Sequence, residues 1–244
     1  MKIIRDRLHA IFFLFKPAKS PEKKRYNYQK KFIKHQFITG EKILDIGSGG
    51  DPFPYATILA DRYLEPTNHR TAEFRSDGKP VIICDISTLP FIDGAFDYVV
   101  AAHVLEHVDD PIKACLELQR VAKAGFIETP TLMKDALFSW AKGMHKWHIL
   151  LQGNRLVFFE YANRASEGIR SSAWYNLIFS TIYHPLQDAF NNNQDLFNII
   201  FEWKKKFDIT VIKQDGSMLS NQDENINNIK SRDIRFNTKS KERS

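Results

Sequence analysis

Four short apolar segments between residues 42 and 130 constrain the fold of this chain more than any other feature. Each spans four to six residues, which is typical of buried strands rather than helices. Residues 111–122, between the third and fourth segments, carry apolar side chains at helical spacing. Strands joined by helical crossovers predict a parallel sheet that binds its ligand at the carboxyl ends of the strands. The predicted strands are residues 42–46, 81–84, 96–101 and 125–128.

The second half of the chain predicts a different mixture of elements. Gly153-Asn154 lies between two apolar runs and indicates a hairpin. Beyond Asp215 the chain is rich in Asn, Ser and Lys, which predicts a disordered tail. The other predicted elements are helices at about 134–143 and 172–183, hairpin strands at 147–152 and 155–161, and a late strand at 207–213.

Length and composition favour one elaborated domain. A chain of 244 residues with 43% hydrophobic residues can bury a core of its own. We expect an N-terminal helix with a linker or lid at 1–35, a main domain at 36–214 and the tail at 215–244. Cys84 and Cys115 show no metal-ligand spacing, so we expect free thiols and a cytoplasmic location.

The formal net charge of +6 is concentrated at the two ends. Residues 1–35 carry a net +9 and residues 230–244 a net +4, which leaves −7 for residues 36–229. The acidic body argues against a nucleic-acid cleft, although basic arms could contact phosphate or an anionic membrane.

Residues 3–15 have the pattern of a basic amphipathic helix, which Pro17 ends. The apolar run at 10–15 is too short to span a bilayer. The helix could pack on the core or cap the site, or residues 1–16 could lie on the inner membrane surface as a peripheral anchor. We expect residues 17–31 to form a solvated linker or a mobile lid.

The strand at 42–46 ends in a glycine-rich turn, Asp45-Ile46-Gly47-Ser48-Gly49. Glycines let the backbone approach a bound ligand closely, because no Cβ stands in the way. The turn alone does not separate a nucleoside site from an ordinary tight turn. The acidic residues after it add specificity, because carboxylates can bind the ribose diol and the adenine amine of a nucleoside.

Consecutive motifs between residues 42 and 130 resemble the class I S-adenosylmethionine-dependent methyltransferases, in the branch with the type 11 methyltransferase domain. The motifs are the glycine turn, then 84–91, 93–108 and 117–121. The resemblance implies an α/β, Rossmann-like methyltransferase fold with a mostly parallel seven-stranded sheet, a C-terminal antiparallel strand and helices on both faces. It makes 42–130 the cofactor half of the domain and 131–214 the acceptor side.

The resemblance also implies a binding site for S-adenosylmethionine. The two loop glycines would lie against its methionine part, and Asp85 and Ile86 would flank its adenine. An alternative for Asp45 is that it organises the glycine loop through backbone N–H groups. The full set of expected cofactor-binding residues is Asp45, Gly47, Ser48, Gly49, Asp61, Asp85, Ile86 and Ala102.

In the family an acidic residue at the end of the second strand binds the ribose, and here the chain departs from the family pattern. Only residues 51–56 separate the glycines from the apolar run 57–60, which is too short for a full first helix. Asp61 is then the ribose candidate. If residues 54–64 form a helix instead, Glu65 takes that role.

His103, Glu106 and His107 are spaced three and four residues apart, so on a helix they would share one face. That face would start at the carboxyl edge of the sheet, where the methyl group is expected. A neutral imidazole there could accept a proton from an acceptor hydroxyl. We therefore name His103, followed by His107, as catalytic candidates.

The same residues allow a metal-binding alternative. They resemble the Glu-x-x-Glu-His cluster of small-RNA 2′-O-methyltransferases, with His103 in place of the first Glu. A fourth ligand could come from His145 or His148, and two imidazoles favour a transition metal over magnesium. The candidate set is His103, Glu106, His107 and His148. A metal-free interpretation, in which Glu106 and His107 orient the following helix, is favoured, so a divalent metal is possible but not expected.

The resemblance implies methyl transfer from S-adenosylmethionine. We expect O-methylation of a sugar or glycan precursor or another small hydroxyl acceptor, and a basic N-terminus would suit a phosphorylated or lipid-linked one. Two rival hypotheses remain: an RNA 2′-O-methyltransferase with a metal-assisted site, and a non-catalytic module that binds cofactor or a partner. The acidic body counts against RNA.

Overall fold

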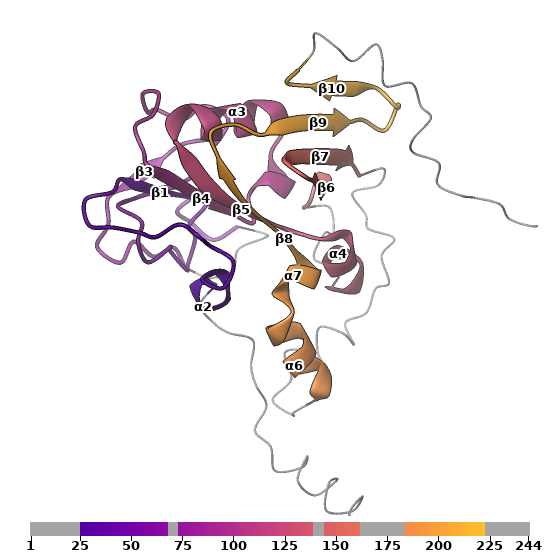
Figure 1. Ribbon diagram of the computed structural model, residues 1–244, viewed down its shortest axis with the longest axis horizontal. Coiled ribbons are helices and arrows are strands. Elements are labelled where there is room, and N and C mark those ends of the chain that lie inside the picture. Colours follow the sequence, from indigo (N-terminus) through magenta and orange to yellow (C-terminus); the bar gives the residue numbers. More distant parts are fainter. Residues whose placement is uncertain (1–24, 68–72, 139–143, 162–183, 223–244) are drawn as a thin grey trace, which may run out of the picture.

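A mostly parallel sheet forms the centre of the computed structural model, which describes residues 25–67, 73–138, 144–161 and 184–222. The strand order is β3-β2-β1-β4-β5-β8 (Figure 1). The first five strands run parallel, and β8 runs antiparallel to β5. The strands are β1 (Ile43–Ile46), β2 (Ile58–Asp61), β3 (Val81–Ile83), β4 (Tyr98–Ala102), β5 (Ala124–Pro130) and β8 (Asn198–Lys204).

This architecture confirms the Rossmann-like α/β class, with one difference in strand number. The sheet contains six strands within the described residues, whereas seven were expected. The antiparallel strand at its edge is β8, which the apolar pattern did not predict. The late strand predicted at 207–213 exists as β9 (Asp208–Ile212), but it belongs to a second sheet.

The central strands are buried on both faces, as continuous apolar runs require. Alternate residues of each strand point to opposite faces, so that Leu44 and Val99 join one core cluster while Ile43 and Val100 join another. The helix α3 (Pro111–Val121) and the second sheet cover the first cluster. Residues near α2 (Tyr26–Gln29) cover the other face.

The second sheet has the order β10-β9-β7-β6 and lies beside α3 (Figure 1). The predicted hairpin is confirmed as β6 (Trp147–Gln152) and β7 (Arg155–Glu160), which pair antiparallel. β7 then pairs parallel with β9. β10 (Met218–Ser220) pairs with β9, so the start of the predicted disordered tail is ordered as a strand.

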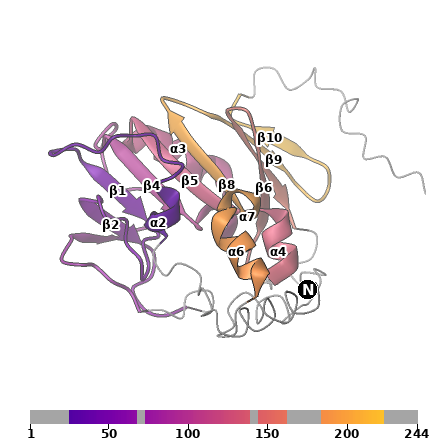
Figure 2. The ribbon, with the colours of Figure 1, turned by 60° about the horizontal axis from the view of Figure 1, so that its bottom comes forward.

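The resemblance implied helices on both faces of the sheet, and the described residues between its strands form few of them. α3 begins at a cap in which the Asp110 carboxylate accepts a hydrogen bond from Lys113 N at 3.0 Å, and Pro111 occupies its first turn. The crossovers 47–57 and 84–97 contain no helix. The other helical elements are η1 (Leu105–His107), α4 (Leu132–Phe138), α6 (Pro185–Asn192) and α7 (Gln194–Phe197), the last three grouped together in Figure 2.

Two further expectations need correction. Residues 54–64 do not form a helix, because residues 58–61 are strand β2. The segment 25–31, expected to be a solvated linker or lid, contains α2, where Tyr28 and Gln29 are buried.

Several other expectations lie outside the described residues: the amphipathic helix at 3–15, the helix at 172–183 and the tail beyond 222. In the part of the chain that is described, no helix has the length and apolar character needed to cross a bilayer. Both cysteines are free thiols, as predicted.

Gly125 generates a test of the packing between β4, β5 and β8. A Cβ there would lie 2.5 Å from Val99 O and 2.9 Å from Trp203 Cζ2. We therefore expect Gly125→Ala to lower the free energy of unfolding by about 3 kcal/mol, because overpacking forces the strands apart. Gly40→Ala, whose methyl would meet nothing within 4 Å, should cost about 1 kcal/mol through its positive φ. Urea unfolding measures both changes, and equal losses of unfolding free energy in the two variants would contradict tight packing around Gly125.

Candidate functional site

The glycine turn lies at the carboxyl end of β1, in the centre of the sheet. Gly47 and Gly49 have φ of 67° and 55°, a left-handed conformation that favours glycine. A Cβ on Gly47 would collide with the side chain of Val104. Gly49 N donates to Asp61 Oδ2 at 3.2 Å, which ties the loop to the end of β2. The hydroxyl of Ser48 is buried and has no hydrogen-bond partner among the described residues.

Asp45, near the end of β1 and just before the loop, organises this loop through a backbone hydrogen bond. Its Oδ2 accepts a hydrogen bond from Phe53 N at 2.7 Å, and the side chain is buried. Burial raises the pKa of Asp45 to about 6, although the nearby Arg25 guanidinium acts in the opposite direction. These contacts match the loop-organising alternative for Asp45.

The remaining predicted cofactor residues gather along the same edge. Asp61 ends β2, and Asp85 follows β3, where it accepts from Ser87 N at 2.8 Å and pairs with Arg62 at 3.1 Å. Ile86 is buried next to it. The structure therefore brings the predicted acids to the carboxyl ends of neighbouring strands, as a nucleoside site requires.

Arg25 spans this edge and was not among the residues predicted from sequence. Its guanidinium donates to Ala102 O at 3.0 Å, to Ser48 O at 3.2 Å and to Asp51 O at 3.1 Å. It thereby connects the carboxyl ends of β1 and β4 to the segment that precedes α2. Its position within a predicted linker gave no signal of this role.

His103 follows β4 directly and has a φ of 58°, which is unusual for a residue with a side chain. Its backbone N–H donates to Glu128 O at 2.8 Å. Its ring Nδ1 lies 3.2 Å from Glu106 Oε1 and its Nε2 lies 3.1 Å from Glu128 Oε1. A neutral imidazole has one donor, so only a protonated ring can donate to both carboxylates. This arrangement argues against His103 as a free base and favours a ring held in place.

The expected helical face of His103, Glu106 and His107 is not what the chain forms. Only Leu105–His107 is helical, as the short 3-10 turn η1, and His103 lies outside it. Glu106 and His103 come together through the left-handed bend at His103, not through helical periodicity.

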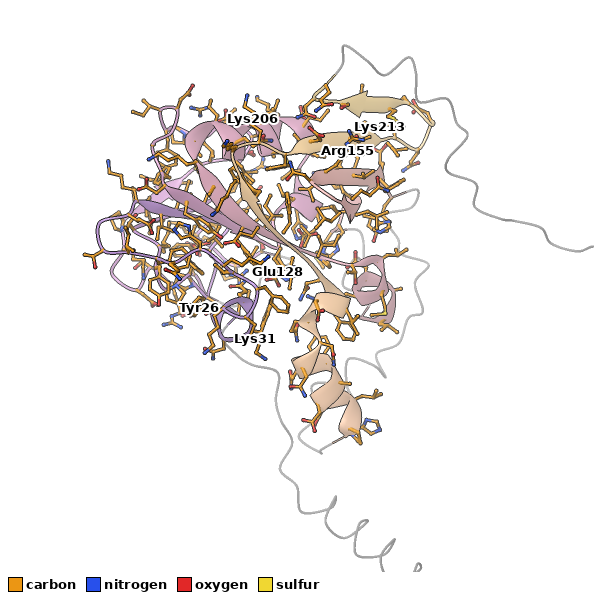
Figure 3. All side chains as sticks on the ribbon, viewed as in Figure 1. Tyr26, Lys31, Glu128, Arg155, Lys206 and Lys213 are labelled. Carbon is orange, nitrogen blue, oxygen red and sulfur yellow. The ribbon has the colours of Figure 1, made fainter. Side chains whose placement is uncertain are left out.

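Glu128, at the end of β5, is the second carboxylate of the site and was also not predicted. Its side chain is fully buried, in the interior next to α2 (Figure 3). It accepts hydrogen bonds from Tyr28 OH and from Gln29 Nε2, the latter at 2.8 Å. A charged residue inside an otherwise apolar strand was the available signal.

A buried cation completes this group. Lys134 Nζ lies 3.5 Å from His103 Nε2 and donates to Asn198 Oδ1 at 2.6 Å. Burial lowers the pKa of Lys134, and Glu128 and Glu106 oppose that shift. Burial alone would raise the pKa of the two carboxyls. The hydrogen bonds and charge of His103, with other nearby cations, instead hold both at about 2.

The candidate metal set is only partly assembled. Glu106, His107 and His145 offer ligand atoms that all lie within 4.8 Å of one another. His148 is not in this group, because it is the neighbour of Trp147 on β6 and its ring stacks on Phe159 at 5.7 Å.

Other polar side chains have structural roles. His184 caps α6, where its Nδ1 accepts from Leu186 N at 3.2 Å. Asp93 pairs with Arg120, and Asp97 accepts a hydrogen bond from Lys42 N.

The low pKa of Glu128 predicts how stability depends on pH. The pKa is about 2 in the folded protein and about 4.3 in an unfolded chain, so the ionised carboxylate stabilises the fold above about pH 4.3. That contribution is lost as pH falls from about 5 towards 2. We expect the free energy of unfolding to fall more steeply over this range in the wild type than in Glu128→Gln.

Urea unfolding at a series of pH values measures this difference. Asp45, whose raised pKa acts with the opposite sign, is present in both proteins and cancels. Glu65→Gln removes an exposed carboxylate and serves as the control. Identical pH slopes for the wild type and Glu128→Gln would show that Glu128 is not ionised in the folded protein.

Comparisons with known proteins concern the segment that contains the predicted cofactor residues. Residues 44–127 match a family model described as a methyltransferase domain, type 11. A demethylmenaquinone methyltransferase of Renibacterium salmoninarum is 31% identical over 93 residues, which cover 36% of this chain and 39% of that protein. An uncharacterized methyltransferase of a Mycobacterium species is 30% identical over 93 residues, or 35% of this chain and 36% of that protein.

The chain thus spans less than half the length of these curated relatives. Among solved structures, the YcgJ protein of Bacillus subtilis is 20% identical, with a TM-score of 0.33 over 44% of this chain and 52% of that one. The segment that matches the family model, residues 44–127, contains the glycine turn, Asp61, Asp85 and His103. Residues 44–127 therefore match the methyltransferase domain family, in agreement with the resemblance to the S-adenosylmethionine-dependent methyltransferases of the type 11 branch.

Proposed function

We propose that the whole chain is a methyltransferase that transfers a methyl group from S-adenosylmethionine to a hydroxyl of a sugar, glycan precursor or similar small acceptor. One observation carries the cofactor part of this proposal. The left-handed glycine turn after β1 is hydrogen-bonded, through Gly49 N, to the acid that ends β2. Ribose and methionine parts of one nucleoside can reach these two groups together.

The residues present fit this cofactor. Gly47 admits no Cβ, because one would collide with Val104, and the buried hydroxyl of Ser48 lacks a partner among the described residues. Asp61 is the residue that would hold the ribose, and Asp85 with Ile86 would hold the adenine. When bound, the cofactor supplies an activated methyl group, and the protein contributes mainly alignment of donor and acceptor.

The acceptor side offers a groove with both apolar and polar side chains. The groove, of about 1120 Å³, is lined by residues of β6 and β8 and by residues 131–133, among them Thr131 and Asn198. Asn198 accepts from Lys134, which lies beside His103. The hydroxyl and amide groups suit an acceptor that carries hydroxyls, while apolar side chains such as Met133 and Ile149 suit an apolar part of the same molecule.

The ribose assignment is tested by calorimetry with S-adenosylhomocysteine. We expect Asp61→Asn to weaken binding at least about 10-fold, because a carboxylate accepting from both ribose hydroxyls contributes more than a neutral amide. Glu65→Gln, a matched change four residues on, should leave affinity within about 2-fold. The reverse pattern would assign the ribose to Glu65, and no binding to the wild type would end the cofactor proposal.

The acceptor class is tested by a methyl-transfer screen over sugars, sugar phosphates and RNA. We expect transfer to a sugar hydroxyl. His103→Ala should lower its rate about 100-fold, because the ring holds Glu106 and Glu128 in place, while affinity for S-adenosylhomocysteine changes little. His184→Ala, which removes the ring that caps α6 and does not line the groove, is the matched histidine control. Transfer to RNA alone would support the rival RNA hypothesis, and unchanged transfer by His103→Ala would remove His103 from the reaction.

A further inference from the structure

Three side chains of types that commonly bind metal ions converge from two separate segments of the chain. Glu106 and His107 belong to η1, and His145 precedes β6. The ligand atoms of the three lie within 4.8 Å of one another, and His107 Nε2 is 3.9 Å from Glu106 Oε1. Ligand atoms about 2.0–2.2 Å from one tetrahedral ion are roughly 3.4 Å apart, so small side-chain rotations would close the site.

Backbone contacts fix the two segments against each other. Lys146 N donates to Glu106 O at 2.7 Å, and Trp147 Nε1 donates to Val108 O at 2.7 Å. The rings of His107 and His145 are in edge contact, with centroids 4.8 Å apart. The convergence is therefore built into the fold and does not depend on a side-chain rotamer alone.

Both imidazoles are oriented by a second hydrogen bond. His107 Nδ1 lies 3.1 Å from Met144 O, and His145 Nδ1 lies 3.0 Å from Asp135 Oδ2. Asp135 is in turn fixed by Tyr161 OH at 2.8 Å. A backbone carbonyl or a carboxylate at Nδ1 places the proton there and the lone pair of the neutral ring on Nε2. Metal-binding histidines commonly have this outer contact.

The Glu106 carboxylate, which lies close to both rings, is only partly hydrogen-bonded. Glu106 is 1% exposed, and its Oε1 faces His103. Its Oε2 is buried and has no hydrogen-bond partner among the described residues. An ionised oxygen in that situation is costly unless a cation or a donor reaches it. A bound cation would meet that requirement.

We propose that Glu106, His107 and His145 bind one divalent transition-metal ion of the zinc class. Two imidazole nitrogens and one carboxylate oxygen are a donor set for such ions, whereas magnesium prefers oxygen ligands alone. The ion would bridge η1 to the segment before β6. The site does not depend on the proposed methyl transfer. It differs from the set expected from sequence in leaving out His103 and in using His145, the alternative named there, in place of His148.

Calorimetry on the full chain, without an affinity tag and after chelator treatment, tests the site with zinc chloride and with magnesium chloride. We expect one equivalent of zinc to bind and magnesium not to saturate. His145→Ala should weaken zinc binding more than about 100-fold, and Asp135→Asn, which loosens the outer contact, about 10–100-fold. His148→Ala, which removes a histidine three residues away, should stay within about 3-fold.

Circular dichroism and cooperative urea unfolding establish that each variant is folded. Because His145→Ala could fail that check, the comparison of Asp135→Asn with His148→Ala and the wild-type metal preference decide the matter independently. The proposal is overturned if the folded wild type shows no saturable zinc binding, if magnesium binds as tightly, or if His148→Ala loses as much affinity as the other two variants. Loss of S-adenosylhomocysteine binding with zinc binding intact would refute only the proposed methyl transfer.

Discussion

The ion-paired carboxylate of Glu128 is the contact on which the arrangement of the site depends. Burying a charge is expensive unless hydrogen bonds and an opposite charge offset the lost hydration. Here the partners come from three places: Tyr28 and Gln29 on α2, His103 after β4, and Lys134 on α4. Satisfying one carboxylate therefore fixes α2, the end of β4 and the start of α4 relative to the sheet.

Shortened crossovers explain why the N-terminal segment takes part in the site. In the described residues no helix lies between β1 and β2 or between β3 and β4. The sheet face that holds Tyr98 and Val100 would be left exposed there, and Tyr26, Phe32 and nearby aromatics pack on it instead. Arg25 lies at the start of this segment, which is why its guanidinium reaches the carbonyls at the ends of β1 and β4.

The second sheet holds η1 in place through hydrogen bonds, as α2 holds the side chain of Glu128. β6 is one edge of that sheet, and the residues just before and at its start hold the backbone of η1 and the loop after it. His145 reaches Glu106 and His107 for this reason, whereas His148, farther along the strand, does not join them. The same sheet also closes the core over α3, so the histidine cluster and the core share one support.

Local sequence determined most of the strands and the turns at their ends. The apolar runs predicted β1, β3, β4, β5 and the hairpin. Adjacent residues suffice for this, because a run of apolar side chains marks a buried strand and a glycine or proline marks its end. The glycine turn follows from the same local rules, whereas the choice of Asp61 and Asp85 came from the resemblance to the methyltransferases. Only the tertiary structure decided that His103 lies between two carboxylates and that β8 closes the sheet. It also decided which distant residues enter the site, namely Arg25, Glu128, Lys134 and His145. These depend on contacts between residues far apart in the chain, and periodicity carries no information about such distances.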